Sequence, residues 1–330
     1  MSATAGGPRE PAADLFARIR RCCGEVARRA RSVRIEEPAL RKLASALAQE
    51  AAPEPDLDPG HHAVGDESTT LAFVISLDAI NFGSGWFPHL RKRGDLSGYR
   101  SIATALRERF ERGPALGAQE LAALRADDCA GLFGQRGVPE VAELMQLFAR
   151  ALSDLGRFLL ARCSGDFGVL VAAAGGRPER LVELLCEMPL YRDVARYEEL
   201  EVPFYKRAQI TVSDLAIAFG GRGPGAFREL SRLTLFADNL VPHVLRCEGV
   251  LALDPALAGR IDAGELLPPG SPEEVELRAC AVHAVEVLVA ELRSRERVTT
   301  ARELDQVLWS RGQRREYKAR PRHRTRCVYY

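Results

Sequence analysis

The feature that most limits the possible fold of this chain is a succession of segments whose apolar residues recur three and four positions apart. The clearest is residues 139–163, which begins with a proline and is long enough to cross a domain. Residues 13–33 repeat the pattern and place arginines on the opposite side. Such spacing is typical of amphipathic α-helices, and strand signals are sparse. We therefore predict an all-α, mainly helical fold with few or no strands.

The same spacing predicts further helices at residues 36–51, 97–112, 118–126, 177–187, 204–219, 241–249, 272–294 and 299–311. Residues 68–88 are apolar on nearly all sides, so periodicity alone cannot assign them to helix or strand. Residues 53–65 have the composition of a loop. No fixed-period repeat or low-complexity linker divides the sequence. We predict one helical domain spanning residues 1–330, whose helices could form two lobes around a cleft.

Charge and cysteine content argue against several functional classes. The 46 Lys and Arg residues nearly cancel 45 Asp and Glu, so no overall field recruits nucleic acid or an anionic membrane. No apolar run approaches the roughly 18 residues of a membrane span, and the first residues lack the apolar stretch of a signal peptide. Eight scattered cysteines without CxxC, and six histidines without HExxH, argue against a metal site or disulfide framework. We expect a cytoplasmic protein that needs no metal or cofactor.

A single carboxylate, Asp238, stands in an otherwise apolar run that includes Phe236 and ends at Asn239 and Pro242. An acid there is costly to bury without a reason, because it has few polar neighbours in sequence. One interpretation is that Asp238 or Asn239 caps a helix with Pro242 in its first turn. Another is that the carboxylate takes part in chemistry, and the two interpretations are compatible.

The predicted helix at 204–219 carries Lys206, Gln209 and Ser213 at helical spacing, away from its apolar stripe. A lysine in the first turn opposes the helix macrodipole, which suggests a purpose beyond helix stability. The alternative is a solvated lysine whose stem covers Phe204.

Two more acids have suggestive neighbours. Asp305 and Trp309 are four residues apart and would share a helical face. Together they could hydrogen-bond and stack a heterocyclic base, or Asp305 could simply pair at the surface with Arg302 or Arg311. Asp78 lies inside an apolar stretch, where it is either a site residue or a core residue satisfied by backbone groups.

The C-terminal tail, residues 312–330, is strongly basic but ends in Cys-Val-Tyr-Tyr, residues that favour burial. We predict that the tail docks on the body of the protein. Docking would deliver His323, Arg324 and Arg326 to a site where guanidinium groups could bind a phosphate. The competing interpretation is a loose basic tail that binds RNA.

Taken together, several segments resemble the queuosine salvage protein family, the queuosine 5′-phosphate N-glycosylases. They run in family order: LDAINF at 77–82, SGYRSI at 97–102, LYRDVARYE at 190–198, PFYKRAQI at 203–210, LTLFADNLVPHVLR at 233–246, EVELRA at 274–279, LDQVLW at 304–309 and HRTRCVYY at 323–330. The resemblance implies an all-helical fold similar to that of helix-hairpin-helix DNA glycosylases. It covers the chain from about residue 60 to its last residue.

The resemblance also implies an activity, hydrolysis of the N-glycosidic bond of queuosine 5′-monophosphate, which releases queuine for reuse in tRNA modification. Asp238 would be catalytic, as a nucleophile or as a stabiliser of the oxocarbenium ion. The expected substrate-binding residues are His61, Asp78, Asn81, Lys206, Phe236, Asp305, Trp309, His323, Arg324 and Tyr330. Acids would accept from the base, aromatic rings would stack on it, and Lys206 with the tail cations would hold the phosphate. No stable nucleic-acid or membrane partner is implied.

Two other functions fit parts of the pattern. A glycosylase acting on nucleic-acid lesions would present a broad positive face, whereas the net charge of this chain is +1. Its binding would weaken steeply with added salt. A non-catalytic queuine carrier would bind the base but leave the nucleotide intact, and it would not need Asp238.

Overall fold

The computed structural model describes residues 14–50, 58, 60–62 and 65–330. The α-helices are α1 (Leu15–Arg29), α2 (Glu37–Ala48), α3 (Glu67–Ala79), α4 (Gly98–Arg112), α5 (Ala118–Ala123), α6 (Ala126–Leu132), α7 (Ala142–Arg162), α8 (Phe167–Ala172), α9 (Pro178–Leu185), α10 (Lys206–Ala218), α11 (Leu240–Cys247), α12 (Pro255–Asp262), α13 (Pro272–Arg293), α14 (Ala301–Gly312) and α15 (Arg315–Lys318). Short 3₁₀ turns are η1 (Phe87–His89), η2 (Pro139–Val141), η3 (Pro189–Tyr191), η4 (Gly223–Gly225) and η5 (Leu230–Arg232). The prediction of a mainly helical fold is confirmed.

The strands form two small antiparallel pairs. Strand β1 (Val33–Ile35) pairs with β4 (Leu251–Leu253), and β2 (Val194–Tyr197) pairs with β3 (Leu200–Pro203). The helix predicted at 13–33 is shorter in the structure, because α1 ends at Arg29 and the chain then becomes extended and enters β1. The strands of both sheets are three or four residues long, which is too short for an alternating apolar pattern to reveal them in the sequence.

Some boundaries differ from the predictions. The ambiguous stretch at 68–88 is helix α3 followed by irregular chain and η1. The segment at 118–126 is divided between α5 and α6, and the short helices α8 and α12 were not predicted. Within the predicted loop at 53–65, residues 53–57, 59 and 63–64 lie outside the described residues.

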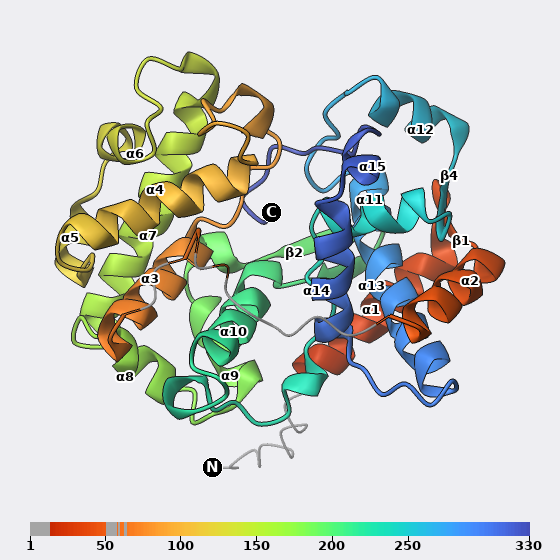
Figure 1. The fold of residues 1–330 in the computed structure, drawn as a ribbon, viewed down its shortest axis with the longest axis horizontal. Helices are drawn as coiled ribbons and strands as arrows, with labels where there is room; N and C mark the ends of the chain where they lie inside the picture. The colour runs from red at the N-terminus through yellow and green to blue at the C-terminus, as the bar shows by residue number, and fades with distance from the viewer. Residues whose placement is uncertain (1–13, 51–57, 59, 63–64) are drawn as a thin grey trace, which may run out of the picture.

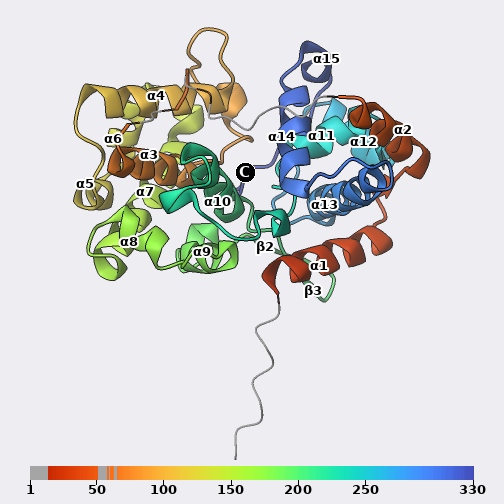
Figure 2. The same cartoon turned by 60° about the horizontal axis from the view of Figure 1, so that its bottom comes forward.

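The helices gather in two groups. Helices α3 to α9 lie on one side of the molecule, α1, α2 and α11 to α15 lie on the other, and the last residues of the chain lie between them (Figures 1 and 2). Helix α10 packs against α3 and α9, and α14 packs against α11 and α13. A side-chain contact joins α10 and α14, because Arg302 of α14 donates to Ser213 of α10 at 2.9 Å.

The C-terminal tail makes contact with both groups. The side chain of Asn239, which precedes α11, donates to the carbonyl of His323 at 3.1 Å. On the other side, a Cβ added at Gly85 would lie only 2.5 Å from the carbonyl oxygen of Thr325, so a glycine is needed where the tail passes. We propose from these contacts that the described chain forms a single domain.

Candidate active site

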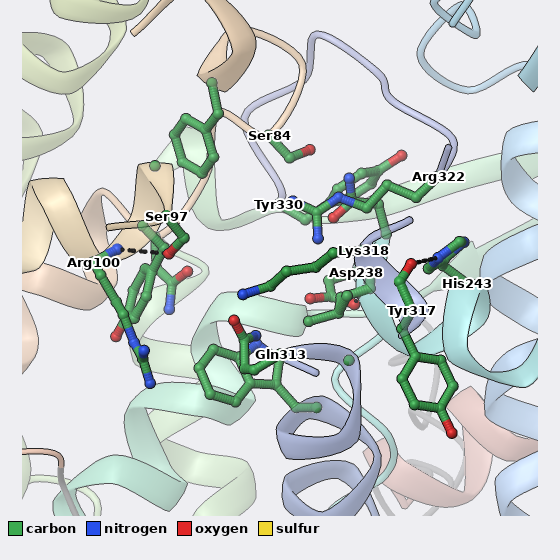
Figure 3. Close-up of a pocket in the computed structure, with 18 of the residues that line it drawn as sticks. Ser84, Ser97, Arg100, Asp238, His243, Gln313, Tyr317, Lys318, Arg322 and Tyr330 are labelled. Carbon is green, nitrogen blue, oxygen red and sulfur yellow. Dashed lines mark hydrogen bonds between the residues drawn. The ribbon is translucent and has the colours of Figure 1, made fainter. Parts of the chain in front are cut away.

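A cavity of about 810 Å³ lies where α10, α14, the chain before α11 and the C-terminal tail converge (Figure 3). Helix α10 contributes one face to its wall, formed by Lys206, Ile210, Ser213, Asp214 and Ile217. Helix α14 contributes Asp305, Gln306, Trp309 and Ser310. In both helices the lining positions recur three or four residues apart, so they lie on one face, and each helix presents polar groups to the cavity.

The irregular segment 233–239, which carries Asp238, is fixed by side chains from two helices. The carboxamide of Gln209 on α10 accepts from the amide of Thr234 at 2.9 Å and donates to its hydroxyl at 2.9 Å. The carboxyl of Asp305 on α14 accepts from the amide of Phe236 at 3.1 Å. A segment without secondary structure thereby has its backbone groups satisfied.

A buried ion pair holds the same segment from a third helix. Arg278 on α13 binds both carboxylate oxygens of Asp193, at 3.0 and 2.6 Å, and its Nε donates to the carbonyl of Ala237 at 3.0 Å. Asp193 also accepts from the backbone amide of Lys206 at 3.1 Å. The pair thus positions both the residue before Asp238 and the first residue of α10.

Asp238 presents one free oxygen to the cavity. Its Oδ1 accepts from the amides of Leu240 and Val241 at 2.7 and 3.0 Å, so the predicted capping role at the start of α11 is confirmed. Within the described chain its Oδ2 has no hydrogen-bond partner, and the residue lines the cavity. The cap fixes the orientation of the carboxylate and leaves the second oxygen available to a ligand.

Lys206 is buried beside this carboxylate, so the interpretation as a solvated surface lysine is wrong. Its Nζ donates to the backbone and side-chain oxygens of Asn81, both at 3.2 Å. Burial lowers the pKa of Lys206, and the strongest opposing influence is Asp238, with smaller contributions from Asp78 and Asp305.

Asp305 is also buried, and surface pairing does not occur. Arg302 instead donates to Ser213 at 2.9 Å, and Arg311 pairs with glutamates. Burial raises the pKa of Asp305 well above that of an ordinary carboxyl, and the nearby charge of Asp238 raises it further. Asp305 therefore holds its proton more tightly than an exposed acid does.

The tail supplies four cations to the cavity. Arg320 lies 3.8 Å from Asp262, and we call the other three, Lys318, Arg322 and Arg324, the cationic wall. Within the described residues none of these three has a carboxylate at ion-pair distance. Figure 3 shows Lys318 and Arg322 extending into the same space as Asp238. Burial lowers the pKa of Lys318, and Arg100 and Arg322 lower it further through repulsion. An anionic ligand would relieve this repulsion.

Asp238 is close enough to interact electrostatically with Arg322 of the cationic wall and with Asp305. Asp305 and Asp214, a second acid that lines the cavity, are called the acidic wall. Burial lowers the pKa of Arg322, and the charge of Asp238 raises it. No other acid of the described residues influences this pKa. The pKa of Asp305 responds to burial first, then to Asp238, and more weakly to Asp214. The cavity can therefore hold a ligand that is anionic at one end and rich in hydrogen-bond donors at the other.

Comparison with known proteins identifies the family. The family model described as "Queuosine salvage protein" matches residues 61–330. The chain belongs to the queuosine salvage protein family. A protein of Sphaerobacter thermophilus named queuosine 5′-phosphate N-glycosylase/hydrolase is 38% identical over 311 residues, covering 92% of this chain and 95% of that protein. Proteins of the same name from Mus musculus and Bos taurus are 32% and 31% identical, covering 81% and 92% of this chain and 83% and 96% of their own.

Most of the residues that the resemblance to the queuosine salvage family indicated come together in the cavity. The indicated residues that line the cavity are His61, Asn81, Lys206, Phe236, Asp238, Asp305, Trp309, Arg324 and Tyr330. They come from segments more than 260 residues apart in sequence, from 61 to 330.

Asp78 and His323, which the resemblance indicated, do not line the cavity, and neither does Arg326, which the docked-tail prediction had named. Asp78 is 1% exposed and lies behind the wall, where burial raises its pKa well above the ordinary value. His323 is 2% exposed, and burial lowers its pKa to about 3, so its neutral ring is a poor phosphate ligand. Arg326 lies over the ring of Trp86, 3.9 Å from Glu143. A phosphate role for His323 and Arg326 is therefore corrected.

Two of the lining residues are already engaged. The ring of His61 is 2.8 Å from the hydroxyl of Thr104, and burial lowers its pKa. The hydroxyl of Tyr330 donates to Glu274 at 2.8 Å. These contacts fix their orientation, and they leave less hydrogen-bonding capacity for a ligand than the sequence suggested.

The lining residues that the sequence analysis did not indicate include Tyr99, Asp214, Lys318 and Arg322. Tyr99 lies in the SGYRSI segment that carried part of the family resemblance, which was a usable signal. Asp214 is eight residues after Lys206, two helical turns along the same face, so the spacing could have indicated it. Nothing local distinguishes Lys318 and Arg322 from the other cations of the tail.

Two searches of the described part of the chain were negative. It contains no group of three or more His, Cys, Asp or Glu side chains placed to hold a metal ion. None of its helices combines the length and the apolar character needed to cross a membrane.

Proposed function

We propose that this protein hydrolyses the N-glycosidic bond of queuosine 5′-monophosphate and releases queuine. The observation that carries the proposal is the free Oδ2 of Asp238 in a cavity that is lined by both the cationic and the acidic wall. A 5′-nucleotide has the same order of groups, with an anionic phosphate, a ribose and a base that bears donors. The names of the relatives support this substrate.

The charges orient the nucleotide. Its phosphate meets Lys318, Arg322 and Arg324, where charge-assisted hydrogen bonds are strong. Its base extends toward Asp305, between the rings of Phe236 and Trp309, which offer stacking surfaces. In this orientation the bond between C1′ and the base lies over Asp238.

Hydrolysis breaks the bond from C1′ to the base nitrogen, and the electron pair leaves with the base. Positive charge then develops on the ribose ring, where the Oδ2 of Asp238 stabilises it or bonds to C1′. A water molecule supplies the hydroxyl group that ends on C1′ and the proton that ends on the base. The products are ribose 5-phosphate and queuine, and the balance needs no cofactor.

The departing base needs help that Asp305 can give. Queuine is a 7-deazaguanine, so it has no N7 to protonate. A neutral Asp305 can accept from the N1–H group of the base and donate its own proton toward the base carbonyl, where negative charge develops. Burial and the nearby Asp238 raise the pKa of Asp305, which favours this protonated form.

Asp305→Asn tests this role. The variant retains an acceptor for the amide of Phe236 but has no acidic proton, so we expect kcat to fall about 100-fold. In the wild type, activity should decline as rising pH removes the proton of Asp305, whose pKa is raised, and the variant should lose this ionisation from its pH–rate profile. Asp128→Asn is the control, because Asp128 also accepts one backbone amide, that of Arg125, but lies outside the cavity. An unchanged kcat and profile in Asp305→Asn would exclude the role.

Arg322→Met tests the phosphate site. Loss of a charged hydrogen bond should raise KM for the 5′-monophosphate roughly 10- to 100-fold, with little change for the unphosphorylated nucleoside. Arg326→Met removes an arginine of the same tail that lies outside the cavity, and it should leave both values unchanged. Equal losses for nucleotide and nucleoside in Arg322→Met would place the phosphate elsewhere.

The proposed substrate is a small molecule, and we propose no stable nucleic-acid partner. All eight cysteines are free, which supports a reducing compartment such as the cytoplasm.

The activity itself is tested by incubating the protein with queuosine 5′-monophosphate and separating the products by chromatography. Release of free queuine supports hydrolysis, whereas binding without release would favour a carrier.

A further inference from the structure

Asp214 is a cavity-lining acid to which the proposed mechanism gives no role. It lies on α10 two turns after Lys206, about 12 Å along the helix axis. No hydrogen bond or ion pair joins its carboxyl group to another residue of the described chain. The nearest strong donor of α14, Arg302, is engaged with the neighbouring Ser213 at 2.9 Å. A carboxyl group that faces a cavity without a partner is a candidate ligand contact.

Titratable groups of α3, α4, α10 and α14 surround Asp214. Asp78 on α3 and Asp305 on α14 are buried acids close enough to interact with it electrostatically, as is the hydroxyl of Tyr99 on α4. The cations that oppose them are Arg302 on α14 and Lys206 on its own helix. Burial raises the pKa of Asp214 to about 7 in spite of these two cations. A cationic ligand group would favour its ionised form.

The substrate offers one such group. A guanine-type ring and a ribose phosphate carry no positive charge at neutral pH, but the side chain at position 7 of queuine contains a secondary amine, which is protonated there. With the phosphate at the cationic wall and the ring at Asp305, the acidic wall continues along α10 to Asp214. The unpaired carboxyl therefore lies on the side of the cavity to which the base, and not the phosphate, extends.

We propose that Asp214 binds the secondary ammonium group of the queuine side chain and thereby selects this base over unsubstituted 7-deazaguanine. The inference rests on the proposed function, since it takes its ligand from the proposed substrate. It assigns to one residue the discrimination between a cationic base and a neutral one. A site that pairs a buried charge rejects an analogue that leaves the charge unpaired.

The test compares two substrates. For queuosine 5′-monophosphate, Asp214→Asn should lower kcat/KM roughly 10- to 100-fold. For 7-deazaguanosine 5′-monophosphate, which lacks the amine, the variant should match the wild type within about threefold. Asp127→Asn is the control, because Asp127 is an exposed acid that pairs with Arg136 outside the cavity, and its loss should change neither value. A merely structural role for Asp214 would instead slow both substrates equally, and that result would overturn the proposal, as would no change with either.

Direct binding separates this inference from the proposed function. Calorimetry should show that wild type binds queuine more tightly than 7-deazaguanine and that Asp214→Asn removes the difference. If the wild type releases no base from either nucleotide but this binding difference is present and lost in the variant, hydrolysis fails and the role of Asp214 stands. If hydrolysis occurs and the wild type binds both bases equally, the role of Asp214 is wrong.

Discussion

Replacing Asp238 with asparagine is expected to slow queuine release roughly 1,000-fold while leaving the protein folded. Asparagine keeps a carbonyl oxygen that can accept from the amides of Leu240 and Val241, so the cap of α11 should survive. It removes the negative charge that faces C1′, and with it the stabilisation of the oxocarbenium ion. We expect the loss in kcat, because the phosphate and base contacts that determine binding remain.

Asp254→Asn is the matched control for this substitution. Asp254 caps α12 with the same geometry, since its Oδ1 accepts from the amides of Ala256 and Leu257 at 2.9 and 3.0 Å. It lies away from the cavity, so both variants should lose similar stability, about 1 kcal/mol or less, and only Asp238→Asn should lose activity. Full turnover by Asp238→Asn would exclude the central role of this residue.

Replacing Arg278 with methionine is expected to have the largest effect on stability. The guanidinium is 1% exposed, binds both oxygens of Asp193, and lies 4.0 Å from the ring centroid of Phe204. Its removal leaves Asp193 and Glu274 as buried acids without their partner. Losing one member of a buried pair costs about 3–5 kcal/mol, which urea denaturation should show as a lower free energy of unfolding.

Two further variants test whether the loss of stability comes from the unpaired buried charge and not from the loss of an arginine side chain as such. Arg180→Met removes an exposed arginine that pairs with Glu183, and it should cost under about 1 kcal/mol. Adding Asp193→Asn to Arg278→Met should restore part of the loss, because it removes the uncompensated charge. If Arg278→Met costs no more than Arg180→Met, the ion pair does not hold the segment before Asp238.

Local patterns were sufficient to predict the longer helices and several of the residues that line the cavity. Spacing of three and four predicted the long helices, and the apolar surroundings of Asp238 indicated both its cap and its candidate chemistry. Asp305 and Trp309 share a face that lines the cavity, as their separation of four residues predicted. What the sequence could not indicate was which side of each helix meets another helix. The side-chain contact between α10 and α14 joins residues 89 positions apart, so only the spacing of Asp214 from Lys206 could have drawn attention to that acid.

The tail shows the same limit. Its burial was predicted from its last residues, but the choice of phosphate ligands was partly wrong. In an extended chain successive side chains point to opposite sides. Arg322 and Arg324 therefore face the cavity, while His323 between them faces the interior, where its pKa falls to about 3. The sequence could predict that neighbouring side chains of the tail point to opposite sides, but it could not predict which side faces the cavity.

The central claim is tested most directly by incubating the purified protein with queuosine 5′-monophosphate, with Asp238→Asn in parallel, and following free queuine and ribose 5-phosphate by chromatography. We expect wild type to release the two products in equal amounts and the variant to release almost none. A wild-type protein that binds the nucleotide but returns it intact would contradict the assignment of this cavity as a hydrolytic site.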